Sequence, residues 1–190
     1  ITLTTFDLEK GMRVTCNAEV IEEGSFIINA QKFIQTLKVM EGDEVTLTVD
    51  DKLSACFSCG TSTHRMSALK GSDFPQLPIL KSELGFELPS PLLKKMIGKT
   101  MYAIGVNDQR PVLNGCFFRV QEGKLQLVSC DSFKLAKCKK NVELVNKNTN
   151  GKDFLDYKFI IPAKTVAELI RLLDDDEEAT MQMYYTRKHI

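Results

Sequence analysis

One stretch of this chain occurs twice. Residues 25–49 read SFIINAQKFIQTLKVMEGDEVTLTV, and residues 158–183 read KFIIPAKTVAELIRLLDDDEEATMQM. The apolar helix positions recur with it, as Phe33, Leu37 and Met40 in the first copy and Val166, Ile170 and Leu173 in the second. This i, i+4, i+7 spacing predicts one buried stripe on each helix. A repeat of this size indicates duplication, so the chain should fold as an array of similar units.

Each unit is predicted to run from a short strand into a helix and then into antiparallel strands. A third example, with different residues, is expected between residues 84 and 142. The expected strands are residues 1–6, 12–20, 26–28, 45–49, 53–58, 64–69, 84–88, 113–120, 125–129 and 133–142. A polar stretch at residues 141–157 indicates an exposed loop. Helices on one face of antiparallel sheets make the predicted fold class α+β.

The units are predicted to belong to two domains. Residues 1–72 form the C-terminal part of a first domain, and residues 84–190 form most of a second domain that is truncated. Residues 73–83 form the linker, because KGSDFPQLPILKSE has two prolines, a glycine and no helical period. The chain opens in strand pattern without an initiator Met and closes directly after a strand, which predicts a fragment.

Composition places the chain among ordinary globular proteins, with 43% hydrophobic and 26% charged residues. No apolar run approaches the ~18 residues of a membrane span, so no membrane association is expected. The formal net charge is zero, and any nucleic-acid surface must therefore be local. Six scattered cysteines without a signal-like segment predict free thiols in a cytoplasmic protein.

Nothing in the sequence indicates an enzyme, a cofactor or a metal site. The two histidines, His64 and His189, adjoin no nucleophile elbow, and no Gly-rich phosphate loop is present. The acidic run at residues 174–178 lacks the spacing of a calcium loop. Cys56 and Cys59 match C-x-x-C, and a redox or zinc module is the alternative they raise. Strand alternation, however, points their sulfur atoms to opposite faces.

Basic residues lie off the apolar stripe of every predicted helix. They are Lys32 and Lys38 on the first helix, Lys94, Lys95 and Lys99 on the second, and Lys164 and Arg171 on the third. A solvated helix face explains this pattern as well as a binding surface does. The functional alternative is contact with phosphates without sequence readout, which needs only charge and spacing.

Several motifs, in one consistent order along the chain, resemble a known family. RPVLNG (110–115) and CDSFKLA (130–136) resemble the RPVLxG and TDxHRLA segments of the bacterial sliding clamp, the beta subunit of DNA polymerase III. TTFDLE (4–9), the two strand-to-helix entries FIINAQKF and FIIPAKTV, and SDFPQLP (72–78) resemble other segments of that family.

The resemblance implies a non-enzymatic polymerase subunit with three similar domains. Two such subunits would close head-to-tail into a homodimeric ring around duplex DNA. Its DNA contacts are independent of sequence, and a cleft binds linear peptide motifs of the replicative polymerase and clamp loader. DNA-facing residues would be Lys32, Lys94, Lys95, Lys99, Asn107, Lys164 and Arg171. Cleft residues would be Arg110, Leu113, Cys130, Ser132, Phe133, Lys134 and Leu135. The subunit interface would include His64 and Met66, and the third domain would be absent from this chain.

The motifs depart from the family at the cleft. Cys130 stands where the family usually has Thr, and Ser132, Phe133 and Lys134 stand where it often has a small residue, His and Arg. An apolar cleft with altered rim chemistry is therefore expected, and only part of it, because the family's cleft also uses third-domain residues. A peptide-binding scaffold without a DNA role is the alternative function.

Overall fold

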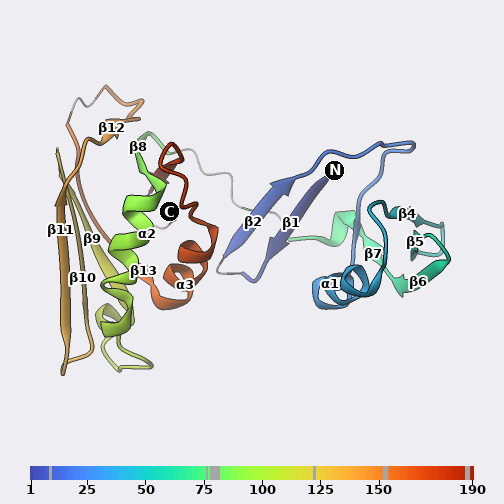
Figure 1. The fold of residues 1–190 in the computed structure, drawn as a ribbon, viewed down its shortest axis with the longest axis horizontal. Coiled ribbons are helices and arrows are strands. Elements are labelled where there is room, and N and C mark those ends of the chain that lie inside the picture. Colours follow the sequence, from blue (N-terminus) through green and yellow to red (C-terminus); the bar gives the residue numbers. More distant parts are fainter. Residues whose placement is uncertain (9, 76, 78–81, 122, 152–153, 187–188) are drawn as a thin grey trace. The chain divides into compact units, whose positions relative to one another are not determined.

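The computed structural model describes residues 1–8, 10–75, 77, 82–121, 123–151, 154–186 and 189–190 (Figure 1). The chain divides into two compact units, Ile1–Pro78 and Ile79–Ile190. This division falls within the predicted linker at residues 73–83, part of which lies outside the described residues. The domain boundaries at 72 and 84 stay a prediction. None of the described helices is long and apolar enough to cross a membrane.

The first unit opens with a hairpin in which β1 (Thr2–Phe6) pairs with β2 (Gly11–Thr15). The predicted strand at residues 12–20 is wrong beyond Thr15. The register places Thr15 opposite Thr2, and Cys16 exchanges backbone hydrogen bonds with Ile1. Residues after Cys16 therefore face no residue of β1. An alternating apolar pattern does not make a strand unless a neighbouring strand forms hydrogen bonds with its backbone groups.

A strand–helix–three-strand repeat follows within this first unit, as the sequence predicts. Its elements are β3 (Phe26–Ile27), α1 (Ala30–Val39), β4 (Thr46–Val49), β5 (Ser54–Cys59) and β6 (Ser62–Ser67), after which β7 (Leu69–Lys70) pairs with β3 and η1 (Gly71–Asp73) follows. The predicted N-cap is confirmed, because the Asn29 side chain accepts a hydrogen bond from the Lys32 amide at 2.9 Å. This contact satisfies one of the free amides of the first helical turn.

The predicted apolar stripe of α1 is only partly buried. Phe33 packs on Phe57 of β5 with ring centroids 5.5 Å apart, and Met40 is 9% exposed. Leu37, however, is 37% exposed. In the described part of this unit α1 is the only α-helix, so no second helix covers the side of the stripe that contains Leu37.

The second unit contains both remaining examples of the repeat. Its elements are β8 (Leu84–Pro89), α2 (Ser90–Gly98), η2 (Met101–Ala103), η3 (Pro111–Leu113), β9 (Gly115–Gln121), β10 (Lys124–Cys130), β11 (Leu135–Asn141), β12 (Val145–Asn146), β13 (Asp156–Pro162), α3 (Ala163–Leu172) and β14 (Thr180–Tyr185). Pro89 and Pro91 flank the start of α2, consistent with the preference for Pro in a first helical turn.

The two repeats of this unit exchange strands. β13 of the later repeat joins β9 in the sheet β11–β10–β9–β13, while β14 joins β8 in the sheet β12–β8–β14. Both helices lie on the same side of the four-stranded sheet (Figure 1). Leu93 of α2 and Val166 of α3, both fully buried, belong to one core with Phe118 of β9 and Leu127 of β10. The predicted α+β class, with helices on one face of antiparallel sheets, is confirmed.

Two details of the second unit differ from the prediction. Leu113 was expected to begin a strand, but Pro111 starts a 3₁₀ turn that ends at Leu113 and is closed by the Asn114 amide. The expected loop at residues 141–157 contains β12, which pairs with β8, and the buried residues Leu155 and Tyr157. Asn148 holds this segment against the rest of the unit, because its side chain accepts hydrogen bonds from the Gly85 amide and the Tyr157 hydroxyl.

Candidate functional site

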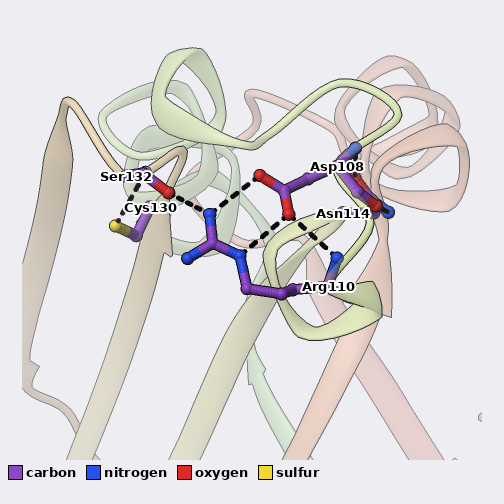
Figure 2. Close-up of polar contacts among 5 residues, drawn as sticks. All are labelled: Asp108, Arg110, Asn114, Cys130 and Ser132. Atoms are coloured by element: carbon purple, nitrogen blue, oxygen red, sulfur yellow. Dashed lines mark hydrogen bonds and ion pairs between the residues drawn. The ribbon is translucent and has the colours of Figure 1, made fainter.

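The polar centre of the candidate cleft is Arg110, which lies in the loop before β9 (Figure 2). Its Nε donates to Oδ1 of Asp108 and its Nη2 donates to Oδ2, both at 3.0 Å. The backbone amide of Arg110 also donates to Oδ1. Nη2 donates in addition to the hydroxyl of Ser132, a residue of the β10–β11 turn (Figure 2). The bidentate pair therefore joins two segments that are separate in sequence and fixes the guanidinium between them.

The Arg110 side chain, and after it the Arg110 backbone amide, lowers the pKa of Asp108 from the usual 3.8 to about 2. Asp108 in turn raises the pKa of Arg110. Hydrogen bonds to the ionised form stabilise that form, so both groups keep their charge at neutral pH. Among the described residues Nη1 of Arg110 has no hydrogen-bond partner, so this nitrogen can donate to a further acceptor.

Asn114 closes the loop that carries these groups. Its Oδ1 accepts the Asp108 amide at 2.9 Å, and its Nδ2 donates to the Asp108 carbonyl at 2.8 Å. Leu113, a predicted cleft residue, is half-buried in the same loop. Asn107, the predicted DNA-contacting residue, is exposed just before Asp108 with a φ of 54°. This left-handed conformation is one that Asn tolerates better than most residues.

The β10–β11 turn holds the remaining predicted cleft residues. Oδ1 of Asp131 accepts the amides of Phe133 at 3.0 Å and Lys134 at 2.7 Å, and Ser132 has a φ of 77°. The Lys134 amide is the first cause that lowers the pKa of Asp131, and Nζ of Lys134 lies 3.1 Å from Oδ2. This network explains why β11 begins at Leu135 rather than at the predicted residue 133.

The turn leaves apolar side chains in solvent. Phe133 is 95% exposed and Leu135 is 66% exposed, and the half-buried Cys130 lies opposite Leu135 in the β10–β11 register. The Cys130 thiol accepts a hydrogen bond from the Ser132 amide at 3.4 Å. The structure thus brings Arg110, Ser132, Cys130 and Leu135 together at one end of the sheet.

Sequence reasoning missed three exposed apolar residues near this end. They are Tyr102, Val106 and Val112, which are 63%, 86% and 62% exposed. Nζ of Lys134 donates to the Tyr102 carbonyl at 3.5 Å, which links that residue to the turn. The sequence signal that could have found them is the presence of large apolar residues in segments without a helical or strand period. Asp108 was also missed, and its only signal in the sequence is that it lies two positions before Arg110.

The predicted DNA-facing side chains are not equivalent. Lys32, Lys95, Lys99 and Lys164 are exposed and form no ion pair with a described residue. Lys94 is bound to Asp175 in the loop after α3 at 2.5 Å, and Arg171 lies 3.7 Å from Glu168. Lys94 and Arg171 therefore bring less net charge to the helix face than the sequence suggested.

The predicted interface residues His64 and Met66 lie on β6, an edge strand of the sheet β4–β5–β6. Both are half-buried, and they line a shallow depression of about 310 Å³ between β6 and α1. Lys32 and Val39 of α1 contribute to the opposite wall. The depression therefore places a predicted DNA-facing lysine beside the predicted interface.

Cys56 and Cys59 lie on opposite faces of β5, where Cys56 is half-buried and Cys59 is buried. The Cys59 thiol contacts the Glu41 carbonyl at 3.5 Å. No group of three metal-ligating residues occurs among the described residues. This geometry contradicts a redox or zinc pair at the C-x-x-C sequence.

Two family models match the chain. The model of the DNA polymerase III beta subunit N-terminal domain matches residues 1–78, and that of the central domain matches residues 87–190. A beta sliding clamp from Halalkalibacterium halodurans is 34% identical over 179 residues, which cover 94% of this chain and 45% of that protein. A beta sliding clamp from Chlamydia pneumoniae is 30% identical over 181 residues, covering 95% and 48%.

Solved structures share the fold. A DNA polymerase sliding clamp from Pseudomonas aeruginosa, solved with a ligand, superposes with a TM-score of 0.82 at 25% identity over 98% of this chain and 49% of that chain. The DNA polymerase III beta subunit from Thermotoga maritima gives 0.82 at 24% identity over 98% and 48%. The chain spans about half the length of the relatives it matches. Since the central-domain model alone matches more than half of its residues, the chain belongs to the DNA polymerase III beta subunit family.

Proposed function

We propose that this chain is part of a DNA sliding clamp, a non-catalytic subunit that encircles duplex DNA and tethers the replicative polymerase. The observation that carries the proposal is the exposed apolar end of the four-stranded sheet, with Leu135 and Phe133 beside the Arg110–Asp108 pair. Membership of the beta subunit family supports the same function. Six free cysteines support a reducing, cytoplasmic setting.

The helices supply the DNA contacts in this proposal. Lys95, Lys99 and Lys164 are exposed on or directly after α2 and α3 and form no ion pair with a described residue. Such contacts read charge and not sequence, and screening by salt weakens them. Lys32 on α1 has the same role in the first unit, whereas Lys94 and Arg171 contribute less because carboxylates already neutralise them.

The cleft supplies the attachment of partners. An apolar segment of a polymerase or clamp-loader subunit packs on Leu135, Leu113 and Cys130, and Phe133 folds over it. Arg110 is already held by Asp108, so it loses little conformational freedom when it binds the peptide. Further residues of the complete clamp complete this cleft.

Ring closure requires a second copy of the full-length protein. β6 is an edge strand whose outer backbone groups can pair with another strand, and His64 and Met66 lie along it. The depression shared with α1 offers a place for side chains of the neighbouring subunit. In the proposed ring this edge is buried between subunits.

The test uses the full-length protein loaded onto nicked circular duplex DNA and washed at raised salt. We expect retention on the circle and loss after the circle is cut, because a ring leaves only through a free DNA end. Screened phosphate contacts cannot distinguish the two forms. Equal retention on circular and linear DNA would reject the clamp and favour a peptide-binding scaffold without a DNA role.

A further inference from the structure

The outer face of the four-stranded sheet is basic. Residues such as Phe118, Val120 and Leu127 point into the core and are fully buried, so the alternate residues point outward. Among the described residues of the four strands, the charged outward positions are Lys124, Lys137, Lys139, Arg119 and Lys158, against the single carboxylate Asp156. This face was not among the sites indicated by sequence.

Three of these cations lie in one line across the sheet. The register pairs Lys139 with Gln126, Gln126 with Arg119, and Arg119 with Lys158. We call Lys139, Arg119 and Lys158 the basic row. None of the three forms an ion pair with a described carboxylate.

The basic row is electrostatically unsatisfied. Arg119 and Lys158 are directly opposite each other on neighbouring antiparallel strands, an arrangement that destabilises a sheet when the charges are alike. The Nε atom of Arg119 is buried and has no hydrogen-bond partner in the part of the chain that the structure describes. An unpaired buried donor is costly, and an anion bound to the Arg119 guanidinium would offset the like charge of Lys158.

Protection of sheet edges explains only part of the row. β11 and β13 are the edge strands, and lysines on edges discourage pairing with other chains. That role accounts for Lys139 and Lys158. It does not account for Arg119, which lies on the internal strand β9.

The basic row is continuous with the cleft. Gln126, which lies between Lys139 and Arg119 in the register, is four residues before Cys130 on β10, a distance of about 14 Å along the strand. The outward positions between them are Val128 on β10, Phe117 on β9 and Lys137 on β11, two apolar residues and one further cation. An extended partner segment spans that distance in about four residues.

We propose that the basic row binds the acidic end of the peptide that occupies the cleft. The apolar anchor lies on Leu135 and Cys130, and carboxylates about four and five residues away pair with Arg119 and Lys158, which lie one and two strands across from Gln126. This inference rests on the proposed function and specifies which partner segments the cleft prefers. A single-stranded nucleic acid fits less well, because Phe117 is the only aromatic residue at the described outward positions, whereas such sites stack successive bases.

The test measures binding of fluorescent peptides to the full-length protein. The peptides share a Leu-Phe anchor and carry a Glu pair, a Gln pair or a Lys pair four residues from it, in versions on either side. We expect the Glu peptide on one side to bind about threefold to tenfold tighter than its Gln counterpart at low salt. Lys158→Gln and the double variant with Arg119→Gln should remove that advantage, and the control Lys140→Gln, on the other face of β11, should keep it.

The outcomes separate this inference from the proposed function. Equal binding of Glu and Gln peptides by the wild-type protein, with anchor binding intact, overturns the inference and leaves the clamp proposal standing. Failure of every peptide to bind overturns the cleft itself. A larger loss of DNA retention in Lys158→Gln than in Lys95→Gln would assign the row to nucleic acid and also overturn the inference.

Discussion

Arg110 and Asp108 bind each other through two parallel hydrogen bonds of 3.0 Å. Because this pairing lowers the pKa of Asp108 to about 2, the carboxylate contributes to stability above its usual pKa of 3.8 and loses that contribution as the pH falls towards 2. An NMR titration should give a midpoint near 2 for Asp108, and Arg110→Gln should return it towards 3.8. Identical midpoints in both proteins would contradict the bidentate pair.

The helix lysines should differ in their effect on DNA binding. In the full-length protein, Lys95→Gln removes an unpaired charge and should lower the slope of log affinity against log salt by about 0.9 if that lysine contacts one phosphate. Lys94→Gln should change the slope less, because Asp175 already neutralises Lys94. The slope is measured by retention on duplex DNA over a salt series.

Asp175→Asn provides the matched control for this comparison. It releases Lys94 without touching the helix, and the salt slope should then increase. If Lys94→Gln and Lys95→Gln weaken binding equally, the ion pair does not persist in the DNA complex, and the ranking of these lysines is wrong.

The sequence predicted the elements whose patterns are local. Asn29 marked the start of α1, Pro91 the start of α2, and the repeat placed α3 and its flanking strands. The wrong predictions concern segments whose structure depends on pairing with a strand elsewhere in the chain. Strand β2 stops opposite Thr2, the first residue of β1, and β12 forms because β8 offers a partner, although residues 141–157 look polar throughout.

The candidate site was predictable by motif more than by geometry. Arg110 and Ser132 were both predicted, and the structure shows that they are hydrogen-bonded. Neither the neutralisation of Lys94 nor the cross-strand row through Arg119 could be predicted, because both depend on which residues tertiary packing places opposite each other. Periodicity describes one element at a time and gives no register between elements.

Leu135→Asp should abolish peptide binding by the full-length protein and leave the fold intact. Leu135 is 66% exposed, so a carboxylate there stays hydrated in the free protein but would have to be desolvated against an apolar peptide. Fluorescence anisotropy measures the binding, and circular dichroism of the same sample checks the fold. Lys140→Asp on the same strand is the control, and unchanged affinity in Leu135→Asp would reject this position for the cleft.

Two phenylalanines of the second unit test whether the cleft is open in the free protein. Phe118 is fully buried and Phe133 is 95% exposed, so urea unfolding should show a loss of about 3–5 kcal/mol for Phe118→Ala and less than about 0.5 kcal/mol for Phe133→Ala. When both variants are folded, Phe133→Ala should weaken peptide binding more than Phe118→Ala does. A loss of stability above about 1 kcal/mol in Phe133→Ala would mean that Phe133 packs on the protein in solution. The aromatic side chain would then fill the cleft itself, and a peptide would have to displace it before binding.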